Sequence, residues 1–163
     1  MGTRFLSRFL IVIISICAWQ VSYAQILPTK IEQVDTLMAK QPKPILVLLS
    51  TDWCQYCAMQ HRQIQKNENF KQKSDLFYFL DFNPDSKDII KFQYKEYVYK
   101  PTGINIGTHE LAFALNGSNK ISYPSWVLLD QQYQPIFRHN GLLNQQQLNE
   151  LVKAIAETFK NNS

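Results

Sequence analysis

The chain has 163 residues, of which 45% are hydrophobic, 13% aromatic and 18% charged. This is enough apolar material for the core of one domain and too much for a disordered chain, while 5 Gly, 7 Pro and 3 Cys exclude collagen-like, glycine-linker and disulfide-dense scaffolds. The formal charge is +4 and falls to +2 if Arg4 and Arg8 are removed with an amino-terminal leader, so the sequence gives little support to nucleic-acid binding.

The first 24 residues have the pattern of a secretory signal peptide. Arg4 and Arg8 precede an apolar run over 9–19, and small side chains at Ser22 and Ala24 stand where signal peptidase requires them. We therefore expect a cleaved signal peptide over 1–24, a single domain over 25–163, and a periplasmic or secreted protein.

Two other readings of this leader are less favoured. The apolar run is shorter than the roughly 20 residues that a membrane-spanning helix needs. Acylation of Cys17 as a lipoprotein conflicts with Ile16, which stands where that processing requires a small side chain. After cleavage, Cys54 and Cys57 are the only cysteines of the chain.

The first half of the domain predicts two helices alternating with two strands. Residues 30–40 place apolar side chains on one helical stripe, and the continuous apolar run over 45–49 predicts a strand buried on both faces. A helix is expected from Cys54 to about Lys73, followed by a buried strand over 76–82. The inward residues expected of the two helices are Ile31, Val34, Leu37, Met38, Met59, Ile64 and Phe70.

The second half predicts a short helix, a hairpin and a final helix. Residues 86–107 fit both strand and helix and are left unassigned. Thr108 is the expected N-cap of a helix that Asn116-Gly117 ends. Strands over 122–130 and 135–139 predict an antiparallel hairpin, and Asn144 caps the last helix. This order predicts an α/β layered domain.

The strongest chemical signal is the pair Cys54 and Cys57, at the junction of a buried strand and a helix. At a helix N-terminus, Cys54 faces free amides and the positive end of the dipole, which favour its thiolate as an attacking group. Cys57, one turn further on, can resolve a mixed disulfide on Cys54. Trp53 can shield the sulfur and offer an apolar surface to a substrate. The pattern therefore favours two-step thiol–disulfide exchange.

Two simpler interpretations remain open. A structural disulfide between Cys54 and Cys57 is natural in an exported protein, although a bridge closing so short a loop restrains the unfolded chain little. A metal site could use Cys54, Cys57 and His61, but no fourth ligand has a matching spacing. Covalent haem attachment is excluded, because Ala58 stands where it requires His.

From about Ile31 to Lys160 the chain resembles the thioredoxin superfamily. Residues 53–57, Trp-Cys-Gln-Tyr-Cys, look like the active-site motif of that family, Tyr123-Pro124 matches its cis-proline, and Gly141 matches the glycine before its last helix. The resemblance implies a thioredoxin fold, with a central mixed sheet flanked by helices and an insertion at about 84–107. It implies Cys54 as nucleophile, Cys57 as resolving thiol, and supporting contacts from Trp53, Gln55, Tyr56, Tyr123 and Pro124.

The chain also departs from that family. Leu48 stands where thioredoxins carry a buried acid that moves the proton of the resolving thiol, so general-base help must come from elsewhere in the protein or from water. Gln55-Tyr56 replaces Gly-Pro, and Arg62 replaces the proline that kinks the active-site helix. These differences indicate an exported thioredoxin-like branch.

The resemblance implies an exported thiol–disulfide oxidoreductase that reduces protein disulfides without a metal or organic cofactor. An unidentified thiol partner, which could be membrane-bound, would recharge it. The alternatives are an oxidase or isomerase, or a metal carrier. For His61 we expect a solvated helix surface more than a proton shuttle, for Asp52 a helix cap, and for Trp126 strand packing. For Tyr94, Tyr97 and Tyr99 we expect core packing more than a partner surface.

Overall fold

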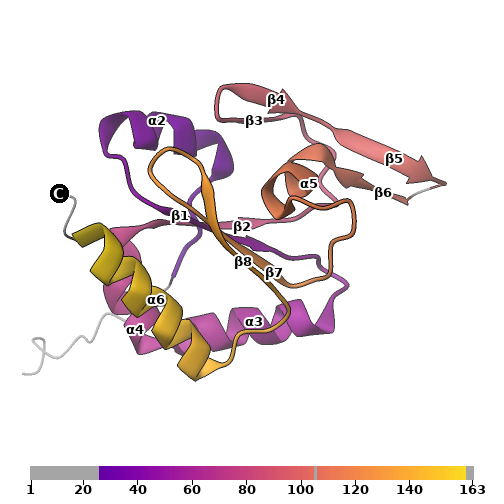
Figure 1. The fold of residues 1–163 in the computed structure, drawn as a ribbon. Helices are drawn as coiled ribbons and strands as arrows, with labels where there is room; N and C mark the ends of the chain where they lie inside the picture. The colour runs from indigo at the N-terminus through magenta and orange to yellow at the C-terminus, as the bar shows by residue number, and fades with distance from the viewer. Residues whose placement is uncertain (1–25, 105, 161–163) are drawn as a thin grey trace, which may run out of the picture.

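The computed structural model describes residues 26–104 and 106–160, so the predicted signal peptide lies outside the described residues (Figure 1). At its centre is a four-stranded sheet in the order β2-β1-β7-β8. β1 (Ile45–Leu49) is parallel to β2 (Tyr78–Phe82), whereas β7 (Ser125–Leu129) is antiparallel to β1 and to β8 (Pro135–Asn140). Within the described ranges, no helix is long and apolar enough to cross a membrane.

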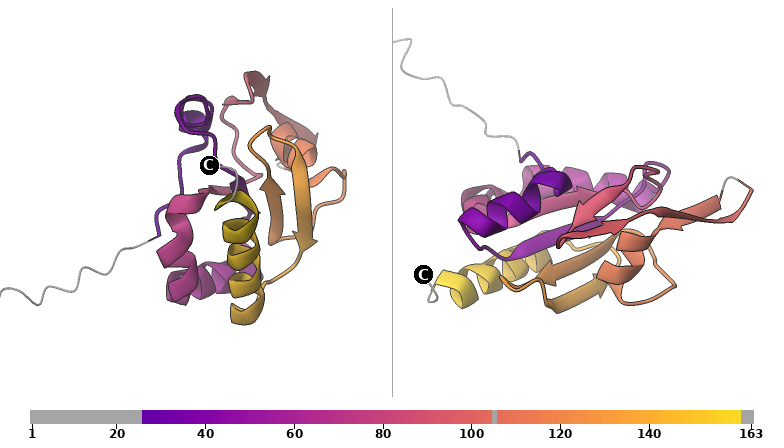
Figure 2. Two further views of the ribbon diagram at one scale, coloured as in Figure 1. Left: turned by 60° about the vertical axis from the view of Figure 1, so that its left-hand side comes forward. Right: turned by 90° about the horizontal axis from the view of Figure 1, so that it is seen from above.

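Helices cover both faces of this sheet (Figures 1 and 2). One face carries α3 (Gln55–Lys66), α4 (Glu68–Lys73) and α6 (Gln145–Lys160); the other carries η1 (Ile31–Gln33), α2 (Val34–Lys40) and α5 (Glu110–Asn116). The central strand β1 supplies both layers, because its side chains alternate. Ile45, Val47 and Leu49 pack toward α2 and α5, while Leu46 and Leu48 pack toward α3, α4 and α6. The predicted mixed sheet flanked by helices is confirmed.

Most predicted elements are present with small shifts of their ends. The first helical stripe, the strand over 45–49, the antiparallel hairpin and the last helix are all found. Asn144 accepts a hydrogen bond from the Gln147 amide, as expected of a cap. Gly117 ends α5 with φ +71° and so takes the left-handed conformation that favours glycine. Trp126 is fully buried in β7, which confirms strand packing.

The single helix predicted from Cys54 to about Lys73 is wrong, because it is broken at Asn67. Asn67 has an extended backbone, and its Oδ1 accepts a hydrogen bond from the Phe70 amide to cap α4. Its Nδ2 donates to Gln145 and Asn149 of α6, which fastens the break to the last helix. Met59 is also wrongly predicted to face inward, since it is 39% exposed. The residues after α4 form η2 (Ser74–Leu76) before β2 begins.

The unassigned segment forms two hairpins. β3 (Ile90–Phe92) pairs with β4 (Lys95–Tyr97), and β5 (Tyr99–Gly103) pairs with β6 (Ile106–His109). The β5–β6 hairpin extends beyond the body of the domain (Figure 1). Core packing is confirmed for Tyr97, which is buried, but is wrong for Tyr94, which is 71% exposed.

The first hairpin is fastened to α2 through one carboxylate. Asp35 accepts hydrogen bonds from the amides of Gln93 and Tyr94, which occupy the turn with φ of 54° and 57°. Asp35 also accepts from the Tyr133 hydroxyl at 2.8 Å. Burial, followed by the contact with Asp35, raises the pKa of Tyr133. One side chain therefore joins α2, the β3–β4 turn and the β7–β8 turn.

His109, instead of the predicted Thr108, is the N-cap of α5. Thr108 lies within β6, and the fully buried His109 Nδ1 accepts from the Leu111 amide at 3.3 Å. The proton is therefore on Nε2, which donates to the Asp88 carbonyl at 3.0 Å. His109 is thus a structural residue that ties the hairpins to α5.

Candidate active site

Cys54 is the N-cap of α3. Its Sγ accepts a hydrogen bond from the Cys57 amide at 3.2 Å, so it lies against the free amides of the first helical turn. A turn in which the Cys54 amide donates to the Thr51 carbonyl delivers it there directly after β1. Cys54 is 7% exposed. Cys54 therefore lies at the N-terminus of the helix, as the sequence predicts.

Cys57 lies one turn inward and is 1% exposed. Both cysteines are free thiols here, so the structure describes the reduced dithiol. Burial, the neighbouring Cys54 and the charge of Asp81 raise the pKa of Cys57 to about 12, against the effect of the Thr51 backbone, which lowers it. The two thiols are therefore unequal: one is capped by amides, and the other is protonated and enclosed.

The segment before β7 packs against the dithiol. The Tyr123–Pro124 peptide bond is cis, as the resemblance implies. The Cys54 thiol donates to the Tyr123 carbonyl at 3.5 Å, and the Gly141 amide donates to the Pro124 carbonyl at 2.8 Å. Gly141 has φ +110°, a conformation that requires glycine. The three landmarks of the resemblance thus meet at the same end of the sheet.

Trp53, one of the site residues predicted from the sequence, lies at the surface beside this segment. Its ring packs edge-on against Tyr123, with centroids 6.0 Å apart, and its Nε1 donates to Asp85 at 2.8 Å. Trp53 nevertheless remains 69% exposed. Burial, and next the charge of Asp85, raise the pKa of Tyr123 to about 12, so this hydroxyl stays neutral.

A hollow of about 480 Å³ opens between the dithiol segment and the second hairpin. Trp53 and Tyr123 line one side, and Tyr99 and Ile106 line the other. Ile106 is 66% exposed although it is aliphatic. The second hairpin, part of the segment left unassigned from the sequence, therefore forms one side of a hollow beside Trp53 and Tyr123.

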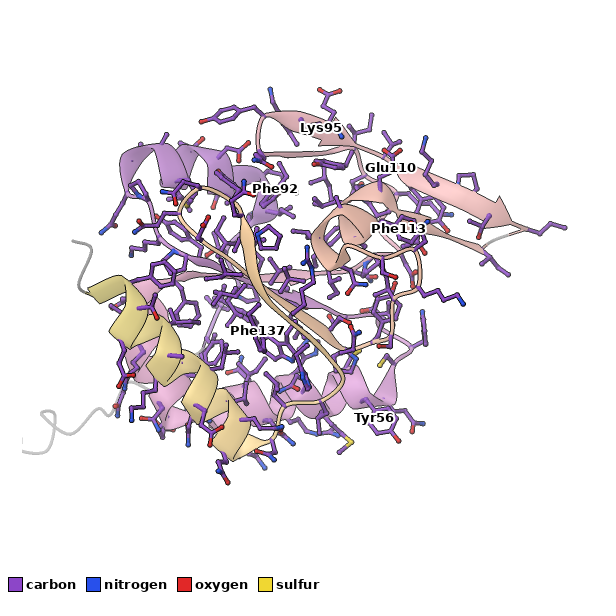
Figure 3. The ribbon with its side chains drawn as sticks, in the orientation of Figure 1. Tyr56, Phe92, Lys95, Glu110, Phe113 and Phe137 are labelled. Atoms are coloured by element: carbon purple, nitrogen blue, oxygen red, sulfur yellow. The ribbon has the colours of Figure 1, made fainter. Side chains whose placement is uncertain are left out.

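Gln55 and Tyr56 occupy the first turn of α3 and point outward. Tyr56 is 64% exposed and projects from the N-terminal end of α3 (Figure 3). Asp52 is not the predicted cap of α3, because Cys54 has that position; its carboxylate accepts instead from Asn83 Nδ2 at 3.3 Å.

Two polar residues near the dithiol were missed from the sequence. Gln60 is fully buried, and its amide both accepts from and donates to the backbone of Leu143, which fixes α3 to the loop before α6. Asp81 lies on β2 in register with Leu48, and its Oδ2 is 2.8 Å from His61 Nε2. The expectation that His61 is merely solvated is therefore wrong. A lone acid inside the apolar strand over 76–82 is the signal that could have found Asp81.

The three residues of the metal alternative are not gathered into one site. His61 Nε2 lies instead beside the Asp81 carboxylate, 2.8 Å from Oδ2. Among the residues that the structure describes, no group of three or more His, Cys, Asp and Glu side chains could hold a metal ion. The geometry thus gives the metal-carrier alternative no additional support.

Residues 32–156 match the family described as the thioredoxin-like domain. The chain belongs to this family. The match covers β1, the dithiol, both hairpins, the cis-proline and most of α6, so this thioredoxin-like chain carries the landmarks of the family in order. It matches no curated protein sequence.

Solved structures agree on the fold. DsbH oxidoreductase aligns with a TM-score of 0.52 and 16% identity, over 83% of this chain and 88% of that one. Chloroplastic thioredoxin z aligns with a TM-score of 0.51 and 15% identity, over 82% and 96%. A disulphide isomerase from Xylella fastidiosa Temecula1 aligns with a TM-score of 0.51 and 15% identity, over 82% and 99%. At these identities the likeness establishes a thioredoxin fold.

Proposed function

We propose that this thioredoxin-like chain is an exported thiol–disulfide oxidoreductase that reduces disulfides in other proteins. The observation that carries the proposal is the unequal dithiol: Cys54 caps a helix beside the open surface, and Cys57 is enclosed behind it with its pKa raised to about 12. Such an arrangement suits one attacking and one resolving thiol. The oxidoreductases among the structural neighbours are consistent with this chemistry.

The proposed cycle has two exchange steps. The Cys54 thiolate attacks a substrate disulfide, forms a mixed disulfide, and releases one substrate thiolate that takes up a proton. Cys57 then loses its proton and attacks Cys54 Sγ, which forms the Cys54–Cys57 disulfide and releases the second substrate thiolate. Two electrons pass to the substrate. A separate thiol partner, membrane-bound or soluble, must return them.

The front of the dithiol offers a place for the substrate chain. The Tyr123 carbonyl already bonds the Cys54 thiol, so a substrate backbone can lie along the segment before β7. Trp53 and Ile106 add exposed apolar surface on either side of the adjoining hollow. We therefore infer that substrates present apolar residues next to their disulfide.

Cysteine trapping tests the proposed roles of Cys54 as the attacking thiol and Cys57 as the resolving thiol. In Cys57→Ser, Cys54 can attack but the mixed disulfide cannot be resolved, so covalent adducts with disulfide-bonded proteins accumulate. The matched variant Cys54→Ser retains one buried thiol and should trap little. Equal trapping by the two variants, or none by Cys57→Ser, contradicts the two-step cycle.

The equilibrium potential of the dithiol against glutathione tests the direction. A reductase has a potential close to that of thioredoxin, about −270 mV, whereas a value near about −120 mV belongs to a strong oxidant. A value in the oxidising range reverses the proposed direction while leaving the exchange chemistry in place.

Export is tested on the expressed precursor. We expect the mature protein in the exported fraction to begin at Gln25, since cleavage is proposed after Ala24. Amino-terminal sequencing of that fraction is the measurement. Retention of an intact leader, or absence from the exported fraction, contradicts this part of the proposal.

A further inference from the structure

Cys57 must lose a proton before it can attack Cys54, but its buried thiol cannot release that proton directly to solvent. The thiol is 1% exposed, and at pH 7 a group with a pKa of about 12 is ionised in roughly one molecule in 10⁵. Leu48, on the strand that leads to the dithiol, is fully buried and apolar. If Cys57 resolves mixed disulfides, another group must accept its proton.

A carboxylate stands on the neighbouring strand at the same level. Asp81 is the register partner of Leu48, and both side chains lie on the α3 side of the sheet, because Tyr78, Leu80 and Phe82 occupy the other face. Asp81 Oδ1 accepts from the Ser50 hydroxyl, and Oδ2 lies 2.8 Å from His61 Nε2. β2 is an edge strand of the four-stranded sheet, and the Asp81 side chain is 24% exposed.

His61 joins this carboxylate to the helix that carries the dithiol. It lies four residues after Cys57 on α3, so the two side chains share one face with Cβ atoms about 5–6 Å apart. Its side chain is 42% exposed and can exchange protons with water. The Asp81 carboxylate beside Nε2 favours a proton on that nitrogen, which leaves Nδ1 as the acceptor of the neutral ring.

We propose that His61 takes the proton of Cys57 and passes it to solvent, with Asp81 as the positioning residue that orients its imidazole. This inference rests on the proposed function. In the step, the Cys57 proton moves to the imidazole, the Cys57 sulfur attacks Cys54 Sγ, the bond between Cys54 and the substrate sulfur breaks, and the substrate thiolate leaves. The imidazolium then returns its proton to water or to that thiolate.

The charges around Cys57 and His61 allow two roles of Asp81 to be distinguished, because removal of Asp81 changes the rate of resolution in opposite directions for the two roles. Cys57 faces Cys54 and Asp81, and His61 faces Asp81 and Asp52. Through charge alone, Asp81 hinders ionisation of Cys57, so its removal would accelerate resolution. In the relay, loss of Asp81 misorients the imidazole and slows resolution. Contact with Asp81 is also the largest cause that raises the pKa of His61, against the effect of burial, which lowers it.

The test follows the reaction of reduced protein with an equimolar amount of Ellman's reagent, 5,5′-dithiobis(2-nitrobenzoate). The first thionitrobenzoate is released by attack of Cys54 on the reagent, and the second by attack of Cys57 on Cys54, at a rate independent of reagent concentration. We expect His61→Gln to slow only the second release, by about tenfold or more at pH 7, and Asp81→Asn to slow it as well. His139→Gln and Asp75→Asn, matched changes away from this site, should leave both releases unchanged.

Two further readouts separate proton transfer from a structural effect. The pH profile of the second release should level off above the pKa of His61 in the wild type and continue to rise in His61→Gln. Added imidazole should accelerate the second release in His61→Gln but not in the wild type. An unchanged second release in His61→Gln, or a faster one in Asp81→Asn, overturns the relay. Absence of any second release in the wild type instead overturns the proposed function.

Discussion

Alkylation of the folded, reduced protein by iodoacetamide at pH 7 should modify Cys54 well before Cys57. Burial, the adjacent Cys54 and the charge of Asp81 raise the pKa of Cys57 from 9.0 to about 12, which lowers its thiolate fraction about a thousandfold. A more basic thiolate is a better nucleophile, with a Brønsted slope of about 0.4–0.5. The higher pKa therefore increases the rate constant of the Cys57 thiolate roughly 15- to 30-fold, which offsets part of the loss. The net expectation is alkylation of Cys57 about 30- to 60-fold slower than the same thiol in unfolded protein.

Mass spectrometry can follow the two sites separately. Both cysteines lie in the tryptic peptide 41–62, so fragment ions within that peptide assign each modification. The same protein in concentrated urea is the control, since Cys57 there reacts as an ordinary thiol. The slow rate in folded protein should rise about tenfold per pH unit between pH 7 and 9. Equal alkylation of Cys54 and Cys57 in the folded protein would refute the reasoning.

Three stability measurements test other parts of the structure. Gln60→Leu leaves the buried amide and carbonyl of Leu143 without their hydrogen-bond partner, so urea denaturation should show a free energy of unfolding lower by about 2–4 kcal/mol. The exposed control Gln146→Ala should lower it by less than about 0.5 kcal/mol. Gly141→Ala should cost about 1–3 kcal/mol through its φ of +110°, although a Cβ has space there, and Gly103→Ala should be nearly neutral. The folded-state pKa of His61 is raised above 6.5, so its pairing stabilises the protein fully below pH 6.5 and is lost as pH rises through the folded value. The Tm difference between wild type and His61→Gln should therefore shrink from pH 6 to pH 8.5, and a constant or growing difference would contradict this.

Elements defined by local pattern could be predicted from the sequence. The apolar run of β1 and the stripe of α6 are visible in a single segment, because burial on two faces or one sets their periodicity. The break at Asn67 could not be predicted in the same way. Neither Gly nor Pro marks it, and its stability depends on Gln145 and Asn149, which are about 80 residues away. The first hairpin, over 90–97, escaped prediction because its turn uses Gln93 and Tyr94 at positive φ instead of glycine.

The candidate site also contains residues that local sequence identifies and residues that only the folded structure brings together. Cys54 and Cys57 could be located because the chemistry is contained in four consecutive residues between a strand and a helix. The pairing of Asp81 with His61 could not be predicted, since it exists only once β2 pairs with β1 in a particular register. The local sequence marks Asp81 only as a lone acid inside an apolar strand, and it does not indicate the partner of this carboxylate. Side chains brought together by sheet register are therefore the part of an active site that pattern analysis of one chain misses.

The second hairpin lines a hollow to which neither His61 nor Asp81 contributes, so the hairpin and the His61–Asp81 pair should be separable by mutation. Ile106 lines the hollow beside Trp53 and Tyr123, whereas Ile104, next to the same hairpin, is 92% exposed and does not line it. If a substrate packs on Ile106, its loss removes about 1 kcal/mol of apolar contact. Ile106→Ser should then lower kcat/KM about fivefold for reduction of a peptide whose disulfide is flanked by apolar residues.

The control for this prediction is Ile104→Ser, which makes the same chemical change outside the hollow and should leave kcat/KM within about twofold. Release of both thionitrobenzoates from Ellman's reagent should be unchanged in either variant, because that small reagent does not need the hairpin. Equal losses in the two variants would mean that the hairpin acts through its general stability. A slower second release in Ile106→Ser would mean that the front of the site also controls Cys57, against the division of roles that the positions of Tyr123 and Asp81 support.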